Sequence, residues 1–316
     1  MNSLKEIADY LKNNNNYHII VHKNPDGDCL GSAKALCLAL KNLGKNAKVL
    51  LPNSASPRHE FMWSTQLEDG DFPCENAVCV DVASIGQMGE LYETSFQKSP
   101  SSVCIDHHGT NSGYAHLNFV DAKSAATGEI IFELLELMNI SISIPIAEAL
   151  LVAIADDTGC FQYSNTSSKT HKIVSCLYEI IPNPEPIMRS LYGTHTLGEI
   201  EVLKLVAPSL EYHLDGRVCF MFADLEKVKT IGADPSNVDA WVGLPRSVKG
   251  IEVAAVFKIH SSSEVKVSFR SNNYVDVSAL AAKFGGGGHV RAAGATFFES
   301  VMSAKEKILN ELKKLV

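Results

Sequence analysis

Carboxylate and imidazole side chains follow four separate apolar runs of this chain. Three of these runs have the length and β-branched content of buried strands, and the fourth is helical in pattern. A single aspartate after a strand is often a helix N-cap, and two adjacent histidines often form a hydrogen-bonded loop, so each group alone has a structural explanation. In chain order the groups are His22, Asp26 and Asp28; Asp81; Asp106, His107 and His108; and Asp157.

The elements between these groups would bring them to one edge of a sheet. Strands expected at 18–21, 47–51, 77–80 and 102–105 alternate with helices, which predicts a parallel α/β sheet. The carboxyl ends of parallel strands share one edge, where ligands bind. Helices expected from Thr127 and from Pro145 complete this half, and the second of them runs into Asp157.

Four aspartates at one edge repel one another unless something neutralises them. Asp26, Asp28, Asp81 and Asp157 have only Lys23 nearby in sequence, and each buried like charge costs several kcal/mol. Two divalent cations would cancel four negative charges. A set of oxygens and imidazoles without thiolate fits Mn²⁺, with Mg²⁺ or Co²⁺ as alternatives, better than structural zinc. Two such ions about 3.5–4 Å apart would clamp the attacking and leaving oxygens of an in-line displacement.

Length, charge and cysteine use narrow the class of protein. A chain of 316 residues accommodates two domains of about 100–200 residues each. Residues 1–10 do not resemble a signal peptide, and no apolar run reaches the length of a membrane span. The eight cysteines are scattered without a Cys-x-x-Cys pair, which is typical of a reducing cytoplasm. A net charge of −8 argues against binding long duplex nucleic acid, yet it allows a small phosphorylated substrate in a local basic pocket.

The pattern changes after Pro182–Pro186, where three prolines in five residues favour an extended linker. Two β pairs follow, the first of them a hairpin around Asp215-Gly216. We therefore predict domains at 1–182 and 209–316, joined by a linker and helix at 183–208. The second domain is expected to be α+β with an antiparallel or mixed sheet. Residues 52–73 are expected to form a loop in which Phe61-Met62-Trp63 packs inward.

A glycine-rich segment, Gly285–Gly288 followed by His289, is the main chemical feature of the second half. Four glycines can be a flexible linker or a place of close backbone packing, but their N–H groups can also cradle an anion. Between residues 255 and 294 there are five lysines and arginines against two carboxylates, a net of +3. This local basic character makes Arg270 and His289 candidates for gripping a phosphate.

These motifs, taken together and in order, resemble those of the DHH phosphoesterase superfamily with its DHH-associated C-terminal domain. Relatives often have Ser-Thr where this chain has Ala126-Thr127, and Arg or a similar polar residue where it has Cys160, which leaves finer substrate preference open. The matching motifs are His22-x-Asn24-Pro25-Asp26-x-Asp28, Val80-Asp81, Asp106-His107-His108, Asp157-Thr158-Gly159, Ser268-Phe269-Arg270-Ser271, Gly285–His289 and Ala292-Ala293-Gly294.

The resemblance implies a role for each candidate residue. It implies one metal on His22, Asp26 and Asp81, and a second on Asp28, Asp81, His107 and Asp157, with Asp81 bridging. His108 would face the scissile phosphate, Asp106 would orient its neighbours, and Asn24 would either lie near the phosphate or serve the turn beside Pro25. The implied substrate-binding residues are Arg270, Ser271, Gly286, Gly287, Gly288 and His289.

The compact two-domain size is similar to that of NrnA-type members of the family. The resemblance implies hydrolysis of short RNA oligonucleotides to mononucleotides and of 3′-phosphoadenosine 5′-phosphate (pAp) to AMP. A cyclic-di-AMP or pApA phosphodiesterase is the alternative, followed by an inorganic pyrophosphatase or exopolyphosphatase. A non-catalytic nucleotide-binding module would require a damaged ligand set, and the sequence contains none. The sequence leaves the oligomeric state open, a homodimer included.

Overall fold

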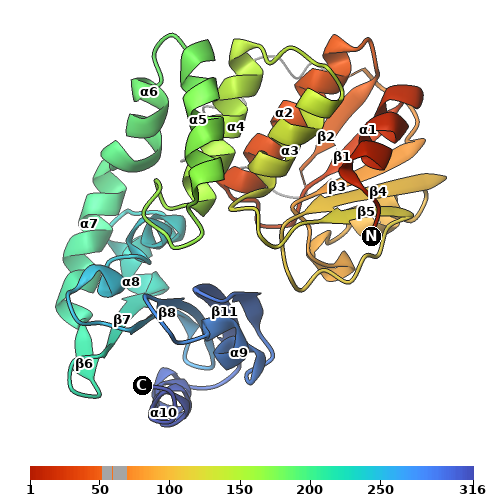
Figure 1. The fold of residues 1–316 in the computed structure, drawn as a ribbon. Helices are drawn as coiled ribbons and strands as arrows, with labels where there is room; N and C mark the ends of the chain where they lie inside the picture. The colour runs from red at the N-terminus through yellow and green to blue at the C-terminus, as the bar shows by residue number, and fades with distance from the viewer. Residues whose placement is uncertain (52–58, 60–69) are drawn as a thin grey trace. The chain divides into compact units, whose positions relative to one another are not determined.

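The chain forms two compact units, Met1–Thr194 and His195–Val316, each built on one sheet (Figure 1). The computed structural model describes residues 1–51, 59 and 70–316. The inward packing predicted for Phe61, Met62 and Trp63 concerns residues outside this description. The division between the units falls within the segment 183–208 that we interpret as the linker.

The sheet of the first unit is wholly parallel, with the strand order β2-β1-β3-β4-β5. This confirms the predicted parallel α/β fold. The edge strand β5 was not predicted from the sequence, because it has only four residues and one of them is an asparagine. The strands are β1 (Tyr17–Ile20), β2 (Ala47–Leu50), β3 (Asn76–Val80), β4 (Ser101–Asp106) and β5 (Leu117–Val120).

The order of the strands creates a switch point at the carboxyl edge of the sheet. From β1 the chain crosses to β2 on one side, and it then returns to β3 on the other side of β1. The segments that leave β1 and β3 therefore diverge, and such a switch point is where open α/β sheets bind ligands. Both segments carry predicted site residues.

Helices α3 and α4 begin at Thr127 and Ile144, at or next to the predicted starts Thr127 and Pro145. Ser3 caps α1 through a capping box with Glu6, and Gly44, just after α2, adopts a φ of +72°. The extended segment expected at 182–186 is wrong in part, because Pro186 lies in the first turn of a helix, where proline needs no N–H partner. The helices are α1 (Leu4–Asn13), α2 (Gly27–Asn42), α3 (Thr127–Leu137), α4 (Ile144–Asp157), α5 (Ser168–Ile180) and α6 (Glu185–Met188), with shorter turns η2 (Ile85–Gln87), η3 (Tyr92–Phe96) and η4 (Arg189–Gly193).

Both faces of the central strands are buried. Alternate residues, among them Ile19, Val78 and Val103, join the large core formed with the helices, whereas Ile20 and Cys79 join a smaller cluster on the opposite face. Burial on both faces explains why these strands appear in the sequence as continuous apolar runs. It also holds the carboxyl ends of β1, β3 and β4 in a rigid frame.

Helices α2 and α4 pack closely at Gly31. A Cβ atom at this position would lie 2.3 Å from the Ala149 carbonyl oxygen and 2.9 Å from the Ala153 nitrogen. Because α2 carries Asp28 and α4 ends at Asp157, this close approach sets the spacing between two of the predicted site residues.

The second unit has a mixed sheet with the order β10-β11-β9-β8-β7-β6. All neighbouring pairs are antiparallel except β7 and β8, which are parallel and joined through helix α8. The predicted loop at 285–289 is partly wrong, because Gly287–His289 pairs with Ala292–Gly294 as a strand. The strands are β6 (Glu211–His213), β7 (Val218–Asp224), β8 (Val253–Ser261), β9 (Glu264–Ser271), β10 (Gly287–His289) and β11 (Ala292–Phe297).

Helices line both faces of this second sheet and give the unit its own cores. In the part of the chain that the structure describes, no helix combines the length and apolarity that a membrane crossing requires. The helices are α7 (Leu197–Val206), α8 (Leu225–Thr230), α9 (Val277–Ala282) and α10 (Val301–Leu312), with 3₁₀ turns η5 (Ala207–Ser209), η6 (Pro235–Trp241) and η7 (Pro245–Ser247).

Substituting Gly31→Ala should lower the free energy of unfolding by about 1–3 kcal/mol, because the added methyl overpacks the contact between α2 and α4. The expected loss outweighs the gain of about 1 kcal/mol that alanine brings to a helix. Urea denaturation of the whole chain measures the difference. Gly86→Ala is the matched control, since a Cβ there meets nothing within 4 Å. Equal stability of the two variants would contradict the close packing.

Candidate metal centre

The segment after β1 carries the first group of predicted site residues. Asp26 is the N-cap of α2, and its Oδ1 accepts a hydrogen bond from the backbone N–H of Cys29 at 3.1 Å. His22 lies in the preceding bend, with its Nε2 3.8 Å from Asp26 Oδ1 and 3.8 Å from Asp81 Oδ2. The cap thus fixes the half-exposed carboxylate of Asp26 close to His22.

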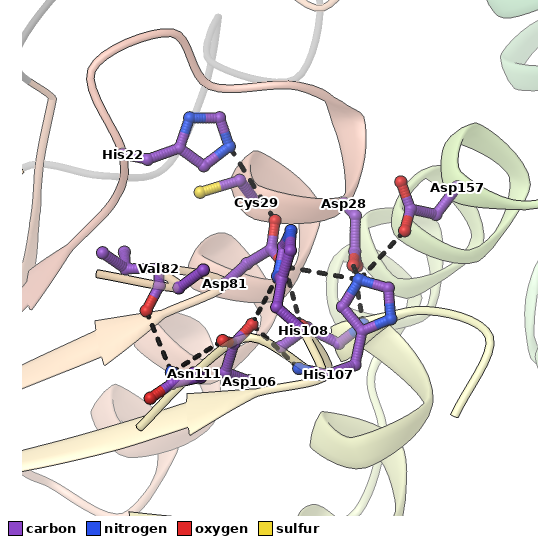
Figure 2. Close-up of polar contacts among 12 residues, drawn as sticks. His22, Asp28, Cys29, Asp81, Val82, Asp106, His107, His108, Asn111 and Asp157 are labelled. Carbon is purple, nitrogen blue, oxygen red and sulfur yellow. Dashed lines mark hydrogen bonds and ion pairs between the residues drawn. The ribbon is translucent and has the colours of Figure 1, made fainter. Parts of the chain in front are cut away.

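Asp81 lies at the centre of the cluster. Its backbone has a φ of +59°, a left-handed conformation that aspartate tolerates better than most residues. The turn it makes at the end of β3 directs its carboxylate toward the imidazoles: Oδ1 lies 3.7 Å from His107 Nε2 and 3.5 Å from His108 Nδ1 (Figure 2). The Thr127 hydroxyl donates to the same Oδ1 at 2.9 Å.

Asp28 is fully buried in the first turn of α2 and is held by three donors. The backbone N–H groups of Thr127 and Gly128 donate to it at 2.6 and 2.9 Å, and the Ser32 hydroxyl donates at 3.0 Å. The N–H groups of Thr127 and Gly128 are at the start of α3, where they have no acceptor within the helix and where the helix dipole favours a negative charge. This interaction links two segments a hundred residues apart.

His107 presents its Nε2 to three carboxylates. Its other ring nitrogen, Nδ1, lies 3.2 Å from the carbonyl oxygen of Ser124, an acceptor, so Nδ1 carries a proton and Nε2 would offer its lone pair to a cation that displaced the proton shared with Asp157. Nε2 lies 3.0 Å from Asp157 Oδ2, 3.7 Å from Asp81 Oδ1 and 3.8 Å from Asp28 Oδ2 (Figure 2). A carbonyl behind a metal-binding imidazole is a common arrangement.

Asp106 is fully buried and organises the histidines that follow it. Its Oδ1 accepts from His108 Nδ1 at 2.7 Å and from the His107 backbone N–H at 2.8 Å. Its Oδ2 accepts from Asn111 Nδ2 at 2.7 Å, and the same amide group reaches the Val82 carbonyl at 3.2 Å. Asn111 and Thr127 are site residues that the sequence did not predict, because no local sequence pattern marks either contact.

The electrostatics of the cluster favour a bound cation. Burial, together with the charge of Asp26, raises the pKa of Asp81 to about 6. Burial and the charges of Asp81 and Asp157 raise the pKa of Asp28 well above its usual value. Burial alone would lower the pKa of His107, but the hydrogen bond with Asp157 raises this pKa well above its usual value. In this state protons relieve the repulsion, and a divalent cation would replace them.

The donor atoms fit cation sites that share Asp81. Within the described residues, the ligand atoms of Asp28, Asp81 and His107 lie within 4.8 Å of one another, and so do those of His22, Cys29 and Asp81. The Cys29 thiol donates to the Val80 carbonyl at 3.4 Å, and burial raises its pKa well above the usual value. The thiol is therefore protonated in this state, and the other members of these two sets offer carboxylate oxygens and imidazole nitrogens.

The remaining predicted residues belong to other segments of the chain. Asn24 is exposed in the bend between β1 and α2. Ser271 and Arg270 are at the end of β9, where Arg270 pairs with Ala292 of β11. His289 ends β10 and pairs with the same alanine.

Two of the predicted glycines have a packing role. A Cβ on Gly286 would lie 2.1 Å from the Gly294 carbonyl oxygen, and one on Gly288 would lie 2.5 Å from that of Ala292. Close backbone packing therefore explains both, whereas Gly287 has open space around its Cβ position.

Comparison with known proteins finds matches over most of the chain. Residues 16–155 match the family model described as DHH family, N-terminal domain, and residues 218–316 match the DHHA1 domain. The bifunctional oligoribonuclease and PAP phosphatase NrnA of Thermus thermophilus is 32% identical over 292 residues, covering 88% of this chain and 83% of that protein. The protein of the same name from Bacillus subtilis is 25% identical, with 94% of each covered. An exopolyphosphatase-related protein from Bacteroides fragilis has the same fold, with a TM-score of 0.87 at 22% identity over 99% of this chain and 96% of that one.

Substituting Asn111→Ala should lower the free energy of unfolding by about 1–3 kcal/mol, because it leaves a buried oxygen of Asp106 without its donor. Urea denaturation gives the value. The control is Asn310→Ala, which removes an exposed amide whose contact is with Lys313. A loss for Asn111→Ala no larger than for this control would show that the Asp106 contact contributes nothing.

Proposed function

This chain belongs to the DHH family of phosphoesterases, and we propose that it hydrolyses short oligoribonucleotides to mononucleotides and converts pAp to AMP. The observation that carries the proposal is the convergence of three imidazoles and the surrounding carboxylates on Asp81. The names of the Thermus thermophilus and Bacillus subtilis relatives support the choice of substrates.

DHH phosphoesterases use divalent metal ions, and we propose that two Mn²⁺ ions bind here. One would be held by His22, Asp26 and Asp81. The other would be held by Asp81 with the three remaining ligands Asp28, His107 and Asp157. When bound, such ions supply Lewis-acid activation of the phosphate. Mn²⁺ suits this set because the donors are carboxylate oxygens and imidazole nitrogens, and Mg²⁺ or Co²⁺ would satisfy the same donors.

His108 is the residue that we propose to face the scissile phosphate. It donates its Nδ1 proton to Asp106, which fixes the ring, and Nε2 is the atom that would face the substrate. Asp106 would thus act through His108 rather than on the phosphate itself. Asn24, exposed beside the helix start, would contribute a side-chain amide near the phosphate.

We assign substrate binding to the second unit, to Arg270 and Ser271 of β9 and to Gly286, Gly287, Gly288 and His289. Arg270 offers a planar set of donors that suits phosphate oxygens. The proposal includes a cytoplasmic location, which the eight free cysteines support, since disulfides are rare in a reducing compartment.

The decisive experiment is a time-course of products with Mn²⁺ on RNA of two to five nucleotides, on pAp and on cyclic dinucleotides. Mononucleotides from RNA and AMP from pAp are the expected products. Preferential turnover of a cyclic dinucleotide would contradict the proposed substrate class, and turnover of none of them would contradict the proposed function.

Substituting Asp81→Ala should abolish hydrolysis and also reduce the amount of bound Mn²⁺, because both proposed sites lose a ligand. Initial rates and metal content after dialysis measure the two effects. Asp9→Ala, on the exposed side of α1, is the control and should keep both at the level of the unchanged protein. Near-normal turnover by Asp81→Ala would show that the shared-ligand assignment is wrong.

Substituting Arg270→Ala should raise KM for a dinucleotide about tenfold or more while kcat changes little, as expected for a lost charge-assisted hydrogen bond to bound substrate. Steady-state kinetics separate the two constants. Lys266→Ala removes a positive charge from an exposed position of the same strand and is the matched control. If both variants raised KM equally, the effect would be one of general charge and not of Arg270.

A further inference from the structure

A buried carboxylate in the second unit holds one loop by its backbone. Glu252, just before β8, is only 3% exposed. Its Oε1 accepts the backbone N–H groups of Tyr274 at 2.7 Å and Val275 at 2.8 Å. Its Oε2 accepts the backbone N–H of Asn273 at 3.1 Å and the side-chain amide of Asn273 at 2.9 Å. Three consecutive N–H groups thus form an anion-binding nest that is filled by a side chain of the same chain.

This interaction keeps Glu252 charged despite its burial. Burial alone would raise the pKa of Glu252, but the N–H groups of Val275 and Tyr274 outweigh that effect and hold the pKa below its usual value. A charge-assisted hydrogen bond is stronger than a neutral one, and three of them act on adjacent residues. The loop at 272–275 therefore has one favoured position.

Arg291 holds the same loop by its carbonyl groups. Its guanidinium donates to the Val275 carbonyl at 2.8 Å and to the Asn273 carbonyl. Its own carbonyl accepts the backbone N–H of Ser271 at 3.1 Å. The loop is thus fixed by an anion at its N–H groups and by a cation at its carbonyl groups.

The loop directly adjoins the residues assigned to substrate binding. It follows Arg270 and Ser271, which end β9. After the loop, the backbone N–H of Val277 donates to the carbonyl oxygen of Val290 at 2.9 Å. Val290 directly follows His289 in the chain. A displacement of the loop would therefore move the ends of both β9 and β10, and with them Arg270 and His289.

We propose that Glu252 is a positioning residue for the substrate: by fixing the loop at 272–275, it holds Arg270 and His289 in the arrangement that binds a nucleotide. The inference rests on the proposed function of this chain. Glu252 would not touch a reacting atom. Its replacement should therefore weaken substrate binding and leave the rate of the chemical step unchanged.

The test is Glu252→Gln in the full-length protein, measured with an RNA dinucleotide and Mn²⁺. Glutamine keeps the size of the side chain but replaces one acceptor oxygen by an NH₂ group, which cannot accept from the nest. We expect KM to rise about tenfold, with kcat within about twofold, in line with the loss of charge-assisted hydrogen bonds. Hydrogen exchange should become faster at the amides of residues 273–275. Glu264→Gln, at the opposite end of β9, is the matched control and should change neither quantity.

The outcomes separate this inference from the proposed function. Faster exchange at 273–275 with an unchanged KM would overturn the positioning role, and so would a fall in kcat alone. No turnover of any substrate by the unchanged protein would instead contradict the proposed function. If Glu252→Gln does not fold, as judged by circular dichroism, Asn273→Ala removes one contact to the same carboxylate. That variant should raise KM by about twofold or more, and an unchanged KM would again overturn the inference.

Discussion

Repulsion between buried carboxylates is the constraint on which the first unit depends. Asp28, Asp81 and Asp157 all lie within 4 Å of one imidazole nitrogen, His107 Nε2. Such crowding is unfavourable by itself, and the raised pKa values of Asp28 and Asp81 express it. The fold must therefore hold the groups in place against their own repulsion. It does so with a sheet buried on both faces and with helices packed as closely as α2 and α4 at Gly31.

Backbone N–H and carbonyl groups hold several side chains of the metal centre in place. The N–H groups at the start of α3 hold Asp28, the Ser124 carbonyl holds His107, and the left-handed turn at Asp81 directs its carboxylate inward. Backbone groups at the ends of helices and strands are held by the hydrogen bonds of those elements, so we expect little reorganisation when a cation replaces the protons. Preorganisation of this kind is what makes electrostatic catalysis effective.

The sequence could predict which residues meet, because strand ends in a parallel sheet share one edge. It could not predict how they are held. Asn111 reaches Asp106 only through the turn after β4, and Thr127 reaches Asp81 only through the packing of α3, so neither contact has a local pattern. The strand β10 was missed because glycines carry no β-forming side chains, and its pairing depends on close backbone approach to β11. The parallel pairing of β7 and β8 was missed because strand direction depends on the path of the chain through α8 and not on strand composition.

The two units have separate cores and concentrate charges of opposite sign. The first concentrates carboxylates that need cations, while the span 255–294 of the second carries a net charge of +3. An arginine placed among the carboxylates of the first unit would pair with them and displace the metal, because a bidentate ion pair satisfies the same oxygens. In the second unit the buried carboxylate of Glu252 accepts three backbone N–H groups. Division into two folded units therefore lets one chain build a carboxylate-rich cluster on one sheet and carry a basic span on another.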